Sequence, residues 1–264
     1  MSPLIVSAVH LAIAATALTA VWLLQLRTRN AGIVDAVWPL VIAAGALLYA
    51  TAGDGDVVIR LTLALLSLAW ALRLSGYLAL RNRGPVEERR YAELRRKWGE
   101  SADRKMLLFF LFQAAVAWLL ALTYLPIAYR TQMPPDAAWM AGILLCLVGI
   151  LGEGIADHQL RAFKRDPRNR QRVCDQGLWR YSRHPNYFFE CLHWAGFPLL
   201  ALQADWAVLS LIGPVLITVL LLKLSGIPTI EARQAVLHRP GYEDYVRRTS
   251  AFVPWPPRKN TSSQ

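Results

Sequence analysis

The sequence contains little cysteine and none of the nucleotide-binding motifs of soluble enzymes. Its three cysteines form no CxxC pair and stand at no metal-ligand spacing from a histidine, so the sequence indicates neither disulfides nor a zinc site. Cys146 and Cys191 lie in apolar runs, where a free cysteine packs as a small hydrophobic residue. The sequence has no GxGxxG motif after a strand and no GxxxxGKS/T motif, which excludes a Rossmann or a P-loop site.

A cleavable N-terminal signal is also missing. The first apolar run, residues 3–26, is too long for the apolar segment of a signal peptide, and no charged segment precedes it. We therefore interpret this run as a transmembrane helix of the mature protein.

Charged residues are scarce within long apolar stretches, although the chain as a whole carries a formal charge of +11. At 55% hydrophobic residues the sequence is too apolar for an ordinary soluble protein, and its Leu/Ala/Val runs exclude a basic nucleic-acid-binding protein. A membrane helix needs about 20 apolar residues. The runs that qualify are residues 4–26, 33–52, 57–80, 106–128, 138–160, 186–202 and 206–224. The sequence therefore predicts an all-α polytopic membrane protein with about seven transmembrane helices.

The distribution of Lys and Arg predicts the orientation of these helices. The connections 81–105 and 161–185 carry nine and eight basic residues, whereas Arg130 is the one basic residue on the opposite side. Because cytosolic loops are enriched in basic residues, we expect an outside N-terminus and a cytosolic C-terminus. We expect one integral-membrane domain over residues 1–257 and a disordered tail over 258–264. Within it, residues 81–105 should form an interfacial amphipathic helix, and residues 240–257 a folded cytosolic cap.

The stretch from Gly177 to Glu190 is basic and polar at its start and then becomes apolar. Pro185 suits the first turn of a helix, and Tyr187, Glu190 and Trp194 would share one face of that helix. A cationic loop at a helix start, with a carboxylate one turn inside, could hold a phosphorylated or zwitterionic small molecule. The alternative is an ordinary basic flank of a membrane helix.

Ionisable residues within the spans are the next candidates, because buried charges in lipid are costly. They are Asp35, Arg60, Arg73, Glu153, Asp157, Glu190 and His193. Asp35 could cap a helix, and Arg73 could pair with Asp35 or Glu190. Asp157 and Arg161 stand at i and i+4 where a span ends, which could also be a salt-bridged helix end.

Several cations are expected on the cytosolic face with aromatic residues between them. The cations are Arg83, Arg90, Arg161, Lys164, Arg180 and Arg183, and the rings are Tyr91, Trp179, Tyr181, His184 and Tyr187. Together they could bind a phosphate-rich cofactor by charge and stacking. Weak binding of anionic lipid headgroups is the alternative.

These motifs resemble the C-terminal half of the steroid 5-alpha-reductase superfamily. The similar residues are the run from Gly177 to Tyr187, Glu190, the preceding Asp157, Arg161 and Lys164, and the segment from Pro240 to Tyr245. The resemblance is specific over residues 152–257, weak over the first 150 residues, and closest to a poorly characterised bacterial membrane branch. It implies an integral membrane protein of a bacterial inner membrane. Related motifs occur in sterol reductases and isoprenylcysteine carboxyl methyltransferases.

The resemblance also implies roles for individual residues. Asp157, Arg161, Lys164, Asn186 and Glu190 are similar to NADPH contacts of the steroid reductases, as are Asn82 and Arg83 after the third span. We add Arg90, Tyr91, Tyr181, Arg183, His184, Tyr187 and Glu231 to the expected cofactor-binding set, and no metal. The Gln-Glu pair that helps polarise the steroid ketone in that superfamily has no clear match in this sequence. The resemblance therefore supports the cofactor-binding residues better than the substrate-binding residues.

We therefore expect an NADPH-dependent reductase of a carbon–carbon double bond in an apolar lipid enone, steroid-like or isoprenoid. The enolate oxygen needs a proton donor or a hydrogen bond, for which Tyr77 and Asp35 are candidates, with Arg73 orienting Asp35. The expected partners are a lipid substrate from the bilayer and membrane lipids, and not nucleic acid.

Two other functions stay open. An S-adenosylmethionine-dependent methyltransferase of a lipid or prenyl thiol would also fit residues 183–187 and Glu231. S-adenosylmethionine carries no phosphate, so the number of cations modestly favours NADPH. A non-catalytic lipid-binding protein is the second alternative.

Overall fold

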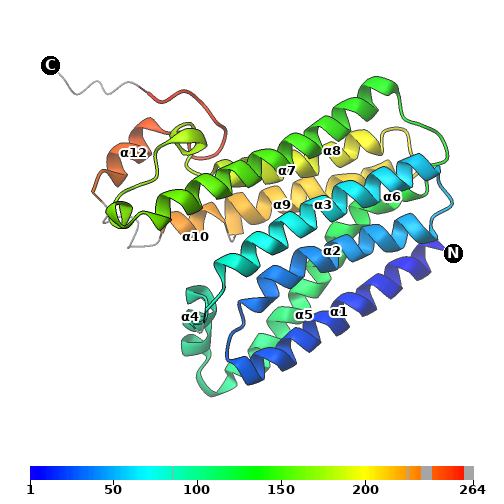
Figure 1. Cartoon of the computed structure of the whole chain (residues 1–264). Helices are drawn as coiled ribbons and strands as arrows, with labels where there is room; N and C mark the ends of the chain where they lie inside the picture. The colour runs from blue at the N-terminus through cyan, green and yellow to red at the C-terminus, as the bar shows by residue number, and fades with distance from the viewer. Residues whose placement is uncertain (85, 225, 233–239, 259–264) are drawn as a thin grey trace. The chain divides into compact units, whose positions relative to one another are not determined.

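The chain folds as a set of α-helices, and no β-strand occurs in residues 1–84, 86–224, 226–232 and 240–258, which the computed structural model describes (Figure 1). Six helical segments are long and apolar enough to cross a membrane. They are Pro3–Thr28, Ile33–Ala52, Val57–Arg81, Arg89–Ala128, Asp136–Arg165 and Ala207–Glu231. This confirms the predicted all-α polytopic membrane class. The predicted orientation of the termini stays a prediction, and residues 259–264 of the expected tail lie outside the described residues.

The sixth predicted run forms helix α8 (Pro185–Leu200), which has 16 residues. At about 1.5 Å per residue, this helix is about 24 Å long, somewhat less than the roughly 30 Å hydrocarbon core of a bilayer. Pro185 is the first residue of α8, as the sequence indicates. Helix α8 is therefore not among the six segments that are long enough to cross a membrane.

The chain forms two compact units. Unit 1 comprises Met1–Met140 and Phe197–Gly213, and unit 2 comprises Ala141–Gly196 and Pro214–Gln264.

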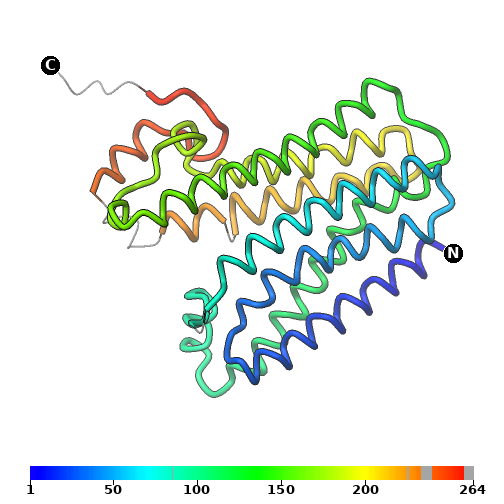
Figure 2. The backbone as a smooth tube through the Cα atoms, in the orientation of Figure 1, coloured from blue at the N-terminus to red at the C-terminus, as the bar shows by residue number. Residues whose placement is uncertain are grey.

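Unit 1 is built on α1 (Pro3–Thr28), α2 (Ile33–Ala52), α3 (Val57–Arg81) and α5 (Ala102–Ala121). Helix α2 contacts each of the other three, and the traces run alongside one another in Figures 1 and 2. Leu18, Ile42, Leu63, Trp70 and Phe110 are fully buried between them. Large apolar side chains that stay exposed on α3, such as Leu61 and Leu65, are typical of a lipid-facing surface.

The turn between α2 and α3 follows from Gly53, Gly55 and Asp56. A side chain on Gly53 would come within 2.4 Å of the Ala128 carbonyl oxygen, so only glycine fits this close approach. The Asp56 carboxylate accepts hydrogen bonds from the backbone N–H groups of Val58 and Ile59 and caps α3.

Two predicted apolar runs contain more breaks than hydropathy indicates. Helix α5 ends at Ala121, and a 3₁₀ turn leads to the four-residue α6 (Leu125–Ala128), which has Pro126 in its first turn. The last run divides into a 3₁₀ segment, α9 (Ile212–Val219), a π-helical turn Leu220–Leu224 and α10 (Ile227–Glu231). Proline in a first helical turn loses no hydrogen bond, so Pro126 lets α6 begin, and Pro228 lets α10 begin, without an unpaired amide at that position.

Helix α4 (Arg89–Trp98) is the predicted amphipathic helix of the 81–105 connection. Tyr91 is fully buried, and both Tyr91 and Trp98 pack edge-to-face with Phe109 of α5. A polar network also fixes α4, because the Arg95 guanidinium bonds to Glu87, Asp103 and Gln25 at 2.8–3.1 Å. Helix α4 is therefore anchored to unit 1.

In unit 2, α7 (Asp136–Arg165) packs closely on α8 through small residues. A side chain on Gly149 would come within 2.5 Å of the His193 backbone nitrogen, and one on Gly152 would overlap the Phe189 ring. From the other side, a side chain on Gly196 would overlap Cys146. Small residues spaced three to four apart let membrane helices approach closely, where van der Waals packing drives association.

The predicted C-terminal cap is folded over residues 240–258. Helix α12 (Tyr242–Arg248) is held through Tyr245, whose hydroxyl donates to the Trp179 carbonyl oxygen at 2.6 Å. The Trp179 indole N–H in turn donates to the Ala156 carbonyl oxygen of α7 at 2.9 Å. The cap is thus connected to α7 by two buried hydrogen bonds.

Candidate functional site

Two of the residues that resemble NADPH contacts, Asn186 and Asp157, meet in unit 2 between the last turns of α7 and the start of α8. The Asn186 side-chain amide donates to the Asp157 carboxylate at 3.4 Å, which joins the two helices. Asp157 is buried, and Glu153 is buried one turn earlier on α7. An amide and a carboxylate at a helix junction can together donate to and accept from hydroxyl or carboxamide groups.

A second group lies in the loop before α8. Glu231 of α10 accepts from the Arg183 guanidinium at 2.8 Å and contacts the His184 Nε2 at 3.2 Å. The His184 ring stacks on Tyr187, with ring centroids 5.6 Å apart and the planes 6° from parallel. Burial lowers the pKa of His184, and the Glu231 carboxylate partly opposes this shift. The structure thus brings together four residues of the predicted set.

Arg183 is also a structural clamp. Its Nη1 donates to the carbonyl oxygens of Val246 and Thr249, at 3.1 and 2.9 Å, in addition to the ion pair with Glu231. One guanidinium therefore joins the loop before α8 to the end of α12. Much of its donor capacity is used within the protein.

Glu190 points into the interior of unit 2. Its carboxylate accepts a hydrogen bond from the indole N–H of Trp194 at 3.0 Å, and both side chains are buried. The sequence places these two residues on one helical face, and this prediction is confirmed. His193 contacts the Cys146 carbonyl oxygen through Nδ1 at 3.3 Å.

The cations at the end of α7 flank a small hollow of about 170 Å³. It is lined by Leu160, Phe163, Lys164, Asn169, Arg170 and Cys174. Lys164 is exposed and Arg161 is half-buried, while Tyr181 is exposed in the loop before α8. Asn169 and Arg170 were not among the predicted site residues. No sequence signal singled them out, because they lie in and just after a short 3₁₀ turn (Pro167–Asn169) that follows α7 and belongs to none of the recognised motifs.

The other predicted residues belong to unit 1. Asp35, at the start of α2, accepts from the Tyr91 hydroxyl at 2.6 Å and from the Arg90 guanidinium at 2.8 Å. Arg81 lies 3.8 Å from its second oxygen, and the Arg90 guanidinium also lies over the Tyr91 ring. In these contacts Asp35 is an acceptor, and Arg90 and Tyr91 serve to dock α4 on α2.

The remaining unit 1 candidates lie on or after α3. The Asn82 amide donates to the Gly32 carbonyl oxygen at 3.0 Å, which stabilises the turn before α2, while Arg83 is exposed. Arg73 and Tyr77 are half-buried on α3, one turn apart. The printed contacts therefore define two groups of candidate residues in unit 2, and in unit 1 they join Asp35 to Arg90 and Tyr91.

Comparison with known proteins agrees with the membrane-enzyme motifs. A 127-residue part of the chain is 26% identical to 3-oxo-5-alpha-steroid 4-dehydrogenase 1 of Rattus norvegicus. The match covers 48% of this chain and 45% of that protein, so the chain spans about half the length of this curated relative. No solved structure matches the chain. The model of the DUF1295 family, which is described as a protein of unknown function, matches residues 21–249. Because this range is most of the chain, the protein belongs to the DUF1295 family.

Proposed function

We propose that this protein is an NADPH-dependent membrane reductase that saturates a carbon–carbon double bond in an apolar lipid enone, steroid-like or isoprenoid. The name of the rat relative supports a reductase acting on a steroid-like lipid. The single observation that carries the proposal is the contact between Asn186 and Asp157, because it joins two residues that resemble NADPH contacts but lie 29 positions apart. We propose a bacterial inner membrane as its location.

The residues at the junction of α7 and α8 fit the chemistry of NADPH. Asn186 and Asp157 offer a donor and acceptors that suit ribose hydroxyls or a carboxamide. The Tyr187 ring, which His184 supports by stacking, offers a flat surface for a base. Lys164 and Arg161 would neutralise phosphate groups. NADPH, when bound, supplies a hydride for the beta carbon of the conjugated alkene.

The enone oxygen needs a hydrogen bond as negative charge develops on it. We propose Tyr77 as the proton donor, with Arg73 one turn earlier on the same helix to stabilise the developing charge. Asp35 stays a candidate for this role, but it already accepts hydrogen bonds from Tyr91 and Arg90. We therefore assign Asp35 chiefly to the positioning of α4.

A cofactor titration tests the proposal. We expect NADPH to bind the purified protein more tightly than NADH, because cations meet its extra phosphate. Binding of NADPH should weaken as salt is added, since salt screens these cations. Lys164→Ala should reduce this preference for NADPH. Lys105→Ala removes the same charge from an exposed position at the start of α5 and is the matched control. Equal affinities for both cofactors, without a response to salt, would contradict the proposal.

The second candidate function is an S-adenosylmethionine-dependent methyltransferase. The cluster of Arg183, His184 and Glu231 supports it, since these residues fit that reaction class and Glu231 lies 2.8 Å from Arg183 and 3.2 Å from His184. Binding of S-adenosylmethionine in place of NADPH would favour this function. Binding of neither would favour a non-catalytic lipid-binding protein.

A further inference from the structure

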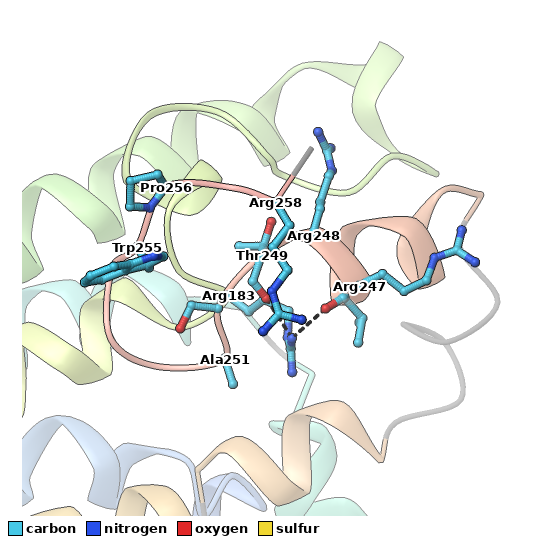
Figure 3. Close-up of a pocket in the computed structure, with 10 residues that line it drawn as sticks. Arg183, Arg247, Arg248, Thr249, Ala251, Trp255, Pro256 and Arg258 are labelled. Carbon is cyan, nitrogen blue, oxygen red and sulfur yellow. Dashed lines mark hydrogen bonds between the residues drawn. The ribbon is translucent and has the colours of Figure 1, made fainter. Parts of the chain in front are cut away.

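A basic pocket of about 360 Å³ lies in the C-terminal cap of unit 2. It is lined by Arg183, Val246, Arg247, Arg248, Thr249, Ser250, Ala251, Trp255, Pro256 and Arg258. Figure 3 shows these residues around the hollow, with the side chain of Arg247 extending away from it. Four arginines and no carboxylate line the pocket, so it is suited to an anion.

The acids that pair with these arginines are not among the lining residues. Arg248 pairs with Asp175, Arg247 with Asp244, and Arg183 with Glu231. These ion pairs fix the walls of the pocket.

Arg258 completes the wall. Its backbone N–H donates to the Arg248 carbonyl oxygen at 2.9 Å, which closes the segment after α12 into a loop. The side chain of Arg258 is exposed, and it lines the pocket. Its guanidinium is therefore accessible to a ligand that enters from solvent or from the membrane surface.

The pocket lies near the end of α7 at which the cations gather. Tyr245 bonds to Trp179, and Trp179 bonds to Ala156 on α7, so the last turn of α12 is held close to the exit of this span. On the rim, Trp255 is 69% exposed and Val253 is 50% exposed. Exposed tryptophan beside basic residues is typical of a segment in the interfacial region of a bilayer.

We propose that this pocket binds the phosphate of an anionic phospholipid headgroup. Arginine recognises phosphate through paired N–H donors, and basic clusters beside a membrane helix attract anionic lipid. The volume is many times the roughly 30 Å³ share of one water molecule, so it leaves room for the glycerol next to the phosphate. Trp255 would lie at the level of the headgroups and hold the rim of the pocket in the interface.

The test measures lipid retained by the detergent-purified protein with native mass spectrometry. Phosphatidylglycerol and phosphatidylcholine are the two lipid probes, and inorganic phosphate is the soluble competitor. Arg258→Gln should weaken phosphatidylglycerol binding roughly fivefold, the scale of one arginine near a membrane surface. Arg104→Gln removes the same charge from an exposed position outside the pocket and should have little effect.

Two further measurements separate the possible ligands. Trp255→Ala should reduce retention of phosphatidylglycerol, because a lipid needs the interfacial ring, whereas a free phosphate does not. Displacement of lipid by inorganic phosphate, with no effect of Trp255→Ala, would assign the pocket to a soluble phosphate and overturn the proposal. An equal loss of phosphatidylglycerol binding in Arg104→Gln would also overturn the proposal. A parallel loss of NADPH affinity in Arg258→Gln would overturn it as well, because the pocket would then be part of the cofactor site.

Discussion

The contact between Asp35 and α4 gives a prediction that separates an anchoring role from a catalytic one. Asp35→Ala removes the acceptor of the fully buried Tyr91 hydroxyl, which costs about 1–3 kcal/mol. It also removes the partner of Arg90, whose side chain is 37% exposed, so this ion pair contributes less than about 1 kcal/mol. The total is about 1–4 kcal/mol against opening of α4.

Hydrogen exchange of the α4 amides in detergent measures this loss. Because about 1.4 kcal/mol is a factor of ten, α4 should open at least roughly fivefold more often in Asp35→Ala. Tyr91→Phe should increase the opening of α4 less than Asp35→Ala does, because Arg90 keeps its contact with Asp35. The double variant should be less destabilised than the sum of the single variants, since they share one hydrogen bond.

Glu93→Ala is the matched control, because Glu93 lies on α4 in an exposed pair with Arg89. It should change the exchange of α4 by no more than about 0.5 kcal/mol. If Asp35→Ala abolishes reduction while α4 exchanges as in the unmodified protein, the anchoring role is refuted. Asp35 would then act on the substrate.

Three further predictions concern unit 2 and the topology. Glu190→Gln keeps an acceptor for Trp194, so the protein should purify normally. In a binding titration, its NADPH affinity should fall by roughly 1–3 kcal/mol. If the variant aggregates and the surviving protein binds NADPH with normal affinity, Glu190 is structural. The pKa of His184 is lowered from 6.5, so the unfolded chain takes up this proton first as pH falls, and thermal stability should decrease below about pH 6.5. His184→Asn should remove part of this decrease. Identical pH profiles of thermal stability for the variant and the unmodified protein would contradict this prediction. A cysteine at exposed position Gln171 should react with an impermeant reagent only after the membrane is opened, and labelling of intact cells would reverse the predicted orientation.

Hydropathy predicted most of the helices and few of their internal breaks. The second span, residues 33–52, agrees with α2 at both ends, because Gly53 stops the helix at a point where only glycine fits. The last run was predicted as one helix and contains several segments, since a hydropathy average does not respond to a proline such as Pro214 in a first helical turn. Helix α7 continues to Arg165, beyond the predicted end at 160, because its last turns are charged but still helical.

The candidate site was predictable in unit 2 and less so in unit 1. Helical periodicity placed Glu190 and Trp194 on one face, and the structure pairs them. The partners of Asp35 could not be predicted in the same way, because Arg90 and Tyr91 lie more than 50 positions away on a separate helix. A pattern of charges indicates that such a carboxylate needs a partner, but only the tertiary fold determines which arginine provides it.

The close packing of α7 on α8 has a consequence for how DUF1295 sequences can vary. At Gly149 an added methyl group would meet backbone atoms, which no substitution on α8 can remove, so this position should stay glycine in every functional relative. At Gly152 the obstacle is the Phe189 side chain. Relatives with alanine or serine at position 152 should therefore carry a smaller residue at position 189, and these two positions should change together over evolutionary time.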